Sequence, residues 1–154
     1  RDQIASAQHT RDGIQQQPDA SGRDRALASS RHHCGLVNVG KLSTHILDTV
    51  HGGPAADVAV ELYSLDPEPK LLVATRTNAD GRTDAPLLKD AEVKRGRYRL
   101  VFHVGEHFRR KGMQLPDPMF VDVVPIEFGI AEEGGNYHVP LVCSPWTFST
   151  YRGS

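Results

Sequence analysis

The stretch 96-GRYRLVFHV-104 decides the fold class, because large apolar side chains alternate in it with charged or polar ones. Alternation with a period of two is typical of a β-strand with one face toward a core and the other toward solvent. We therefore predict a half-buried strand here. The inward set is Tyr98, Leu100, Phe102 and Val104, and the outward set is Arg97, Arg99 and His103.

Similar patterns continue on both sides of this strand. The stretch 56-ADVAVELYSL-65 alternates in the same way, and 70-KLLVATRT-77 follows it after the turn sequence DPEP, so the two predict a hairpin. Further strands are predicted within residues 119–130, 136–144 and 145–151, with Pro125 favouring an edge position or a bulge. Only 105-GEHFRRKG-112 favours a short helix. The pattern predicts an all-β antiparallel sandwich or barrel.

Composition narrows the classes of function. The chain has 154 residues, a hydrophobic content of 38% and a formal net charge of -1, which suits one globular domain. Basic and acidic residues are interspersed, so we expect neither a nucleic-acid partner nor a membrane surface. No stretch approaches the ~20 apolar residues of a membrane-spanning helix. With only Cys34 and Cys143 present, we expect a reducing compartment rather than a disulfide framework.

Residues 1–40 differ from the rest, since they contain no Phe, Trp or Tyr and are rich in small polar residues. Such a segment buries too little apolar surface to offset its ordering entropy. We predict a disordered tail or linker over 1–40 and a folded domain over 41–154. No apolar signal segment precedes the domain, so the expected location is the cytoplasm, or the peroxisome if the source is eukaryotic.

The histidines carry the candidate chemistry. His103 and His107 are four apart, but strand alternation through 104 and the absence of a zincin glutamate favour two unrelated surface histidines over a metal pair. In 136-NYHVPL-141, alternation places His138 on the outer face, opposite Tyr137. Taken alone, His45, Arg82 and His138 would each be ordinary exposed residues.

In order along the chain, four motifs match a known family. They are 42-LSTHILD-48, 77-TNADGR-82, 136-NYHVPL-141 and the terminal 151-YRGS-154. Together they resemble the transthyretin-related 5-hydroxyisourate hydrolases of bacterial type, which act in the oxidation of urate to allantoin. The resemblance covers residues 41–154. The terminal motif discriminates best, because it separates these hydrolases from transthyretin, the hormone carrier with the same fold.

This resemblance implies a sandwich of two four-stranded sheets with one short helix, assembled as a homotetramer built from two dimers. The active sites would lie in the groove where dimers meet, lined by outward strand faces. The implied catalytic residues are His45, Arg82, His138 and Ser154, and the implied substrate-binding residues are His45, Arg82, Tyr151, Arg152 and Gly153. The scheme uses no metal and no cofactor, although two histidines in a groove could hold adventitious zinc.

The implied reaction is the opening of the lactam ring of 5-hydroxyisourate by water. His45 and His138 are the natural acid–base pair, and the guanidinium of Arg82 suits the developing negative charge. The sequence leaves open which histidine is the base. Ser154 would supply a hydroxyl; its use as a covalent nucleophile ranks below direct attack by water, because a terminal serine is poorly held unless the tetramer clamps it.

Three alternatives remain at this stage. A transthyretin-like carrier would need apolar channel residues and would not need the YRGS terminus. If the chain were a structural or adhesion module with a sandwich fold, the match of four motifs in the same order would be a coincidence. The chain could also be the hydrolase part of a larger enzyme that carries a decarboxylase, which changes its context but not its chemistry.

Overall fold

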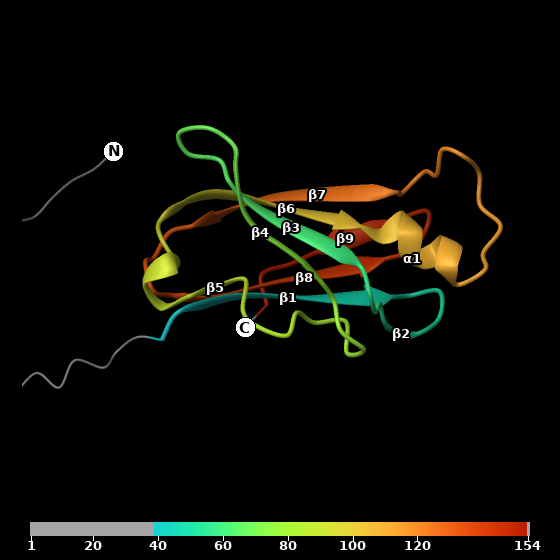
Figure 1. The fold of residues 1–154 in the computed structure, drawn as a ribbon, viewed down its shortest axis with the longest axis horizontal. Coiled ribbons are helices and arrows are strands. Elements are labelled where there is room, and N and C mark those ends of the chain that lie inside the picture. The colour runs from blue at the N-terminus through green and yellow to red at the C-terminus, as the bar shows by residue number, and fades with distance from the viewer. Residues whose placement is uncertain (1–38, 154) are drawn as a thin grey trace, which may run out of the picture. The chain divides into compact units, whose positions relative to one another are not determined.

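The computed structural model describes residues 39–153, which form two β-sheets packed face to face (Figure 1). Residues 1–38 of the tail predicted over 1–40, and the terminal Ser154, lie outside the described residues. The elements are β1 (Lys41–Asp48), β2 (Gly53–Pro54), β3 (Ala59–Ser64), β4 (Lys70–Arg76), β5 (Leu88–Lys89), a 3-10 turn (Asp90–Glu92), β6 (Gly96–His103), α1 (Val104–Arg110), β7 (Val123–Ile130), β8 (Asn136–Cys143) and β9 (Phe148–Thr150).

The sandwich predicted from the alternation is confirmed. One sheet has the order β4-β3-β6-β7, and the other has the order β2-β1-β8-β9, with β5 also paired to β1. The second sheet thus holds five strands rather than four, because the two-residue strands β2 and β5 extend it. It also contains one parallel pair, β1 with β8. The chain passes through the opposite sheet between these two strands, so no hairpin forces them to run antiparallel.

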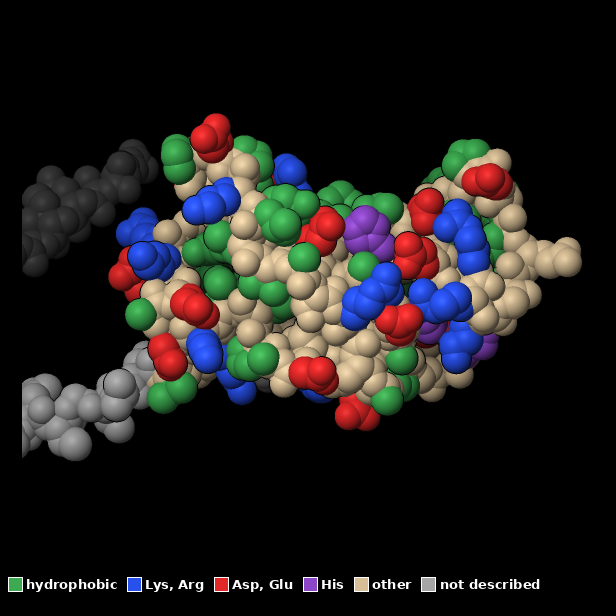
Figure 2. Space-filling view, in the orientation of Figure 1, with side chains coloured by type: hydrophobic (Ala, Val, Ile, Leu, Met, Phe, Trp, Pro, Cys, Tyr) green, Lys and Arg blue, Asp and Glu red, His purple; other side chains and the backbone are tan. Residues whose placement is uncertain are grey.

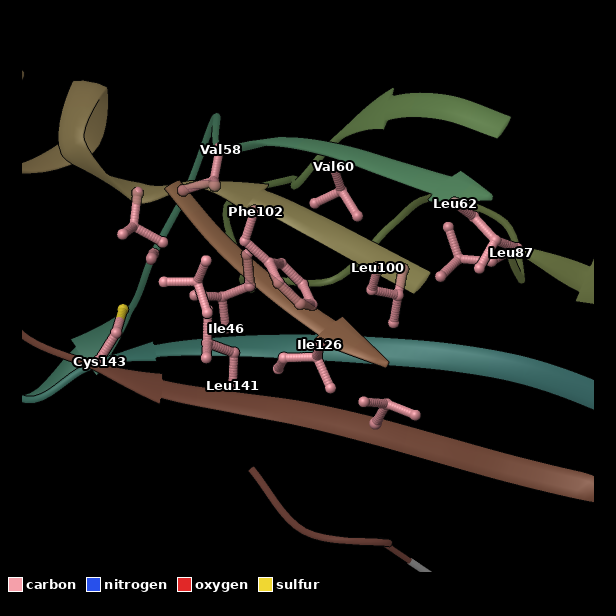
Figure 3. Close-up of a cluster of buried hydrophobic side chains, with 14 of the residues drawn as sticks. Ile46, Val58, Val60, Leu62, Leu87, Leu100, Phe102, Ile126, Leu141 and Cys143 are labelled. Atoms are coloured by element: carbon pink, nitrogen blue, oxygen red, sulfur yellow. The ribbon is translucent and has the colours of Figure 1, made fainter. Parts of the chain in front are cut away.

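The core lies between the sheets and is built from the predicted inward positions (Figure 3). Leu100 and Phe102 of β6 and Val60 and Leu62 of β3 are fully buried. They face side chains from β1 and β8, among them Ile46 and Leu141. The same strands expose their alternate positions, which is where the candidate histidines lie.

The helix and the proline strand also match their predictions. Helix α1 ends at Arg110, and Gly112, two residues further on, adopts a positive φ of 77° without strain. Its inward face buries Phe108 and His107 against the end of the sandwich. Strand β7, which contains Pro125, is the outer strand of its sheet, where a missing N–H costs least.

The face of the domain in Figure 2 shows Lys and Arg side chains interspersed with Asp and Glu, without a patch of one sign. Among the described residues no helix is both long and apolar enough to cross a membrane.

Candidate functional site

Strands β1 and β8 place two candidate histidines on one outer sheet face. The parallel register sets Ser43 opposite His138 and His45 opposite Pro140. In β1 the even positions from Leu42 are buried and the odd positions are partly exposed or exposed, so Ser43 and His45 point out of the core. His138 lies between the buried Tyr137 and Val139. The predicted outward orientation of His138 is therefore confirmed.

The loop after β4 brings Arg82 to the same face. The Asn78 side chain accepts hydrogen bonds from the N–H groups of Asp80 and Arg82, at 3.0 and 3.2 Å, which closes the turn. The Gly81 carbonyl then accepts a hydrogen bond from the N–H of Ile46 at 2.9 Å, and Arg82 forms a β-bridge with His45.

Gly81 is required at this position for two reasons. Its φ of +70° is rarely adopted by residues with a side chain, and a Cβ there would lie 2.5 Å from the carbonyl oxygen of Ile46. The glycine therefore lets the loop backbone approach β1 closely enough to place Arg82 beside His45.

The C-terminal segment packs directly on His138. Gly153 donates its N–H to the His138 carbonyl at 2.9 Å. A Cβ on Gly153 would lie 2.5 Å from Cδ2 of the His138 ring, so only glycine fits. The expectation that Gly153 binds substrate stays a prediction; what the structure shows is a backbone contact with His138.

The other predicted residues of the terminal motif lie close by. The Arg152 guanidinium stands 5.0 Å from the centre of the Tyr137 ring, a cation–π contact that fastens the segment to β8. Tyr151 is exposed. Ser154 lies outside the described residues, so its role also stays a prediction.

Two cavities adjoin His138 and share Tyr137 as a wall. The first has a volume of about 190 Å³ and is lined by Lys41, Ser43, Arg82, Asn136, Tyr137 and His138. The second, of about 210 Å³, lies between the edge strands β7 and β9 and includes Tyr151 and Arg152. The first cavity is the better candidate site, because positive and hydrogen-bonding groups surround it.

Three polar residues of this cavity were missed in the sequence. Lys41 and Ser43 share the outward face of β1 with His45, and Asn136 shares the outward face of β8 with His138. The alternation of each strand was the available signal. Alternation alone did not identify these residues, because the register that brings β1 and β8 side by side is not visible in the sequence.

Ser43 holds the His138 ring. Its Oγ lies 2.9 Å from His138 Nδ1, across the β1–β8 pair. A hydrogen bond at Nδ1 orients the imidazole and couples its tautomer to the serine hydroxyl. Among the described residues no hydrogen bond engages Nε2, so this nitrogen is the one available to a ligand.

Both histidines of the site are shifted toward the neutral form. Burial lowers the pKa of His45 below its usual 6.5, and the charge of Arg82 lowers it further. Burial also lowers the pKa of His138, again assisted by Arg82 and by His45. Both imidazoles are therefore neutral at pH 7 and able to accept a proton.

The expectation of two unrelated surface histidines at 103 and 107 is half wrong. His103 is the last residue of β6 and lies 3.7 Å from Glu61, as suits a partly exposed residue. His107, however, is only 2% exposed and hydrogen-bonds to Asp48. Helix α1 turns it inward, which the sequence pattern did not reveal.

The fold and this site define a transthyretin-type sandwich with a histidine–arginine cavity on its outer sheet face. The chain belongs to the HIUase/Transthyretin family, whose profile matches residues 42–153. It is 50% identical over 116 residues to 5-hydroxyisourate hydrolase 2 of Rhizobium meliloti, an alignment that covers 75% of this chain and 97% of that protein.

Solved structures agree on the fold. The structure of Klebsiella pneumoniae 5-hydroxyisourate hydrolase matches with a TM-score of 0.62 and 37% identity, covering 75% of this chain and 99% of that one. The crystal structure of (S)-allantoin synthase matches with a TM-score of 0.72 and 42% identity over 75% of this chain. This chain spans only 44% of the length of the synthase chain.

Proposed function

We propose that this protein hydrolyses 5-hydroxyisourate to 2-oxo-4-hydroxy-4-carboxy-5-ureidoimidazoline, a step of urate degradation. The observation that carries the proposal is the meeting of His45, Arg82 and His138, from three separate segments, on one outer face. The family relationship supports it, because a relative half identical in sequence bears the name of this hydrolase.

The mechanism uses the neutral state of the two imidazoles. One of them takes a proton from water as the oxygen attacks the lactam carbonyl, and the other protonates the leaving nitrogen. Arg82 and Lys41, which both line the cavity, stabilise the oxyanion that develops. The hydrogen bond between Ser43 Oγ and His138 Nδ1 leaves Nε2 of His138 as the reactive nitrogen. The choice between His45 and His138 as base stays open.

The polar lining of the cavity favours an enzyme over a ligand-carrier protein. A carrier of apolar hormones would line this face with apolar side chains, whereas every residue that lines the cavity here except Tyr137 is polar or charged. A structural sandwich would have no use for the turn that places Arg82 beside His45.

Assembly is a further part of the proposal. Strands β7 and β9 are both edge strands, and the exposed large apolar side chains in or beside them are Val123 in β7, Phe148 in β9, and Trp146 and Tyr151 on either side of β9. An exposed apolar edge of this kind favours pairing with a second copy. We expect a homotetramer made of two such dimers, and light scattering coupled to gel filtration measures its mass.

The cytoplasm remains the proposed location, and Cys143, a buried free thiol, suits a reducing compartment.

The direct test is to add the protein to freshly generated 5-hydroxyisourate and follow the decay of ultraviolet absorbance. We expect a rate far above the spontaneous one, and the rate to fall in Arg82→Ala but not in the control His103→Ala. Decay at the spontaneous rate with well-folded protein would refute the hydrolase assignment.

The role of the terminus needs its own test. Because Gly153 packs on His138, the chain end lies beside the candidate site. Deleting Ser154, or extending the chain beyond it with a short tag, should reduce kcat much more than it reduces thermal stability. An extension without effect on kcat would remove Ser154 from the proposed catalytic set.

A further inference from the structure

A second group of histidines lies at the far end of β1, away from the candidate hydrolase site. It consists of Asp48, the last residue of β1, His51 in the turn that follows, and His107 on α1. Asp48 Oδ2 lies 2.6 Å from His51 Nδ1 and 2.8 Å from His107 Nε2. The three potential ligand atoms all lie within 4.8 Å of one another. The proposed reaction uses none of these residues.

We propose that Asp48, His51 and His107 form a binding site for a divalent transition-metal ion, with Zn²⁺ as the best-fitting ion. Two imidazole nitrogens and one carboxylate oxygen are ligands that Zn²⁺ takes in proteins, and three protein ligands leave a fourth position for water. The ligand set comes from three segments, so a bound ion would tie α1 and the β1–β2 turn to the end of the sheet.

The geometry needs only small adjustments to hold an ion. Tetrahedral Zn²⁺ with bonds of about 2.1 Å places its ligand atoms about 3.4 Å apart, somewhat farther than Oδ2 now lies from either nitrogen. Asp48 Oδ1 is fixed by the N–H groups of Val50 and His51, at 2.9 and 3.1 Å, which keeps Oδ2 aimed at the two rings. This is the outer-shell support that orients a ligating carboxylate.

Burial and access also suit an ion. Asp48 and His107 are each 2% exposed, whereas the His51 side chain is 38% exposed and forms the entry side. On binding, each ring turns a nitrogen lone pair to the ion, and a proton held on that nitrogen moves to the other ring nitrogen or to water, so no oxidant or co-reactant is needed. Cys143, opposite Asp48 in the sheet, is outside the ligand group.

Local charge separates this cluster from the hydrolase cavity. Arg82 and Lys41 line that cavity and repel a cation. Here the ligand set contains the carboxylate of Asp48, which attracts a cation. The cluster is thus the site in the described chain where charge, ligand type and spacing all favour a divalent cation.

The test is a Co²⁺ titration of the full chain in a background carrying both His45→Ala and His138→Ala, so that the two histidines of the candidate hydrolase site do not contribute. Co²⁺ with three protein ligands and water is four-coordinate and gives visible absorption bands that are much stronger, and at longer wavelength, than those of octahedral hydrated Co²⁺. We expect these bands in the background protein. Adding His51→Ala should remove one equivalent of bound Co²⁺ per chain or weaken Co²⁺ binding at least about 10-fold.

The matched control is His103→Ala in the same background. His103 also faces a carboxylate, that of Glu61 at 3.7 Å, but has no third ligand, so its loss should leave the titration unchanged. Residues 1–38 are present in the background protein and in both variants, so the histidines in that segment do not affect the difference in Co²⁺ binding between them.

Zn²⁺ should also raise the melting temperature of the background protein, reversibly with chelator, and this rise should vanish with His51→Ala. Equal binding with and without His51, or no binding, would overturn the proposal and leave a hydrogen-bond network only.

Discussion

Two groups of histidines lie along β1 and differ in nearly every physical respect. His45 joins His138 and Arg82 on an outer, partly exposed face, whereas Asp48 joins His107 and His51 at the buried end of the sandwich. In the first group the neighbouring charge is positive. In the second it is negative. We propose that the same type of side chain serves proton transfer in one place and metal binding in the other.

The pKa shifts follow this difference. Burial and Arg82 keep the pKa values of His45 and His138 below their usual value, which yields neutral imidazoles at pH 7. At Asp48, burial raises the pKa, but hydrogen bonds from His107 and His51 outweigh it and bring the pKa below its usual value. The carboxylate is thus charged at neutral pH in spite of its burial, which suits a cation ligand.

The largest effect is expected from His138→Ala. Loss of a positioned general acid or base costs about 10²–10⁴-fold in rate, so kcat/KM for 5-hydroxyisourate should fall by that order. The matched change in the other group, His51→Ala, should leave kcat/KM unchanged in metal-free buffer. Equal losses in the two variants would mean that the groups are not functionally separate.

Gly153→Ala should have the next largest effect. The new Cβ would lie 2.5 Å from the His138 ring, so either the ring or the terminal segment must move. Since misplacement by about 1 Å can cost up to about 10²-fold, kcat should fall by about 10-fold or more. Gly53→Ala is the control, because a Cβ there meets nothing within 4 Å. If Gly153→Ala kept full kcat, the contact would not position His138.

Asp48→Asn should act on stability instead of rate. The neutral amide loses the charge-assisted hydrogen bonds to two imidazoles in a buried place, which should lower the free energy of unfolding by about 2 kcal/mol. Urea denaturation at fixed protein concentration with chelator measures this, and kcat of the folded protein should stay the same. A drop in kcat without a drop in stability would contradict the separation of the two groups.

The smallest effect is expected from Arg82→Gln on the titration of His138. Removing the positive charge should raise the pKa of His138 toward 6.5, but not fully, because burial is the larger cause of the shift. In the wild-type protein the ring should thus become protonated only as the pH falls below 6.5, and in the variant at a higher pH. NMR titration of the His138 ring measures both. An unchanged or lower pKa would show that Arg82 does not act on His138.

Much of the fold was predictable, and the reason is visible in β6 and β8. Strand alternation is a local property, so the inward Phe102 and the outward His138 follow from neighbouring residues alone. The short strands β2 and β5 were missed, because two residues carry no period. The burial of His107 was missed as well, because in a helix of seven residues the inward face depends on what the helix packs against.

The sequence by itself determined the longer strands, the sandwich class, the family motifs and the outward orientation of His138, since each of these is read from local stretches of the chain. Only the tertiary structure decided the parallel register of β1 with β8, the hydrogen bond between Ser43 and His138, and the joining of Asp48 to His107. The contact between Ser43 and His138 links residues 95 positions apart, and the contact between Asp48 and His107 links residues 59 positions apart. Side chains so far apart meet only after the sheets have packed, and no local pattern specifies which of them will.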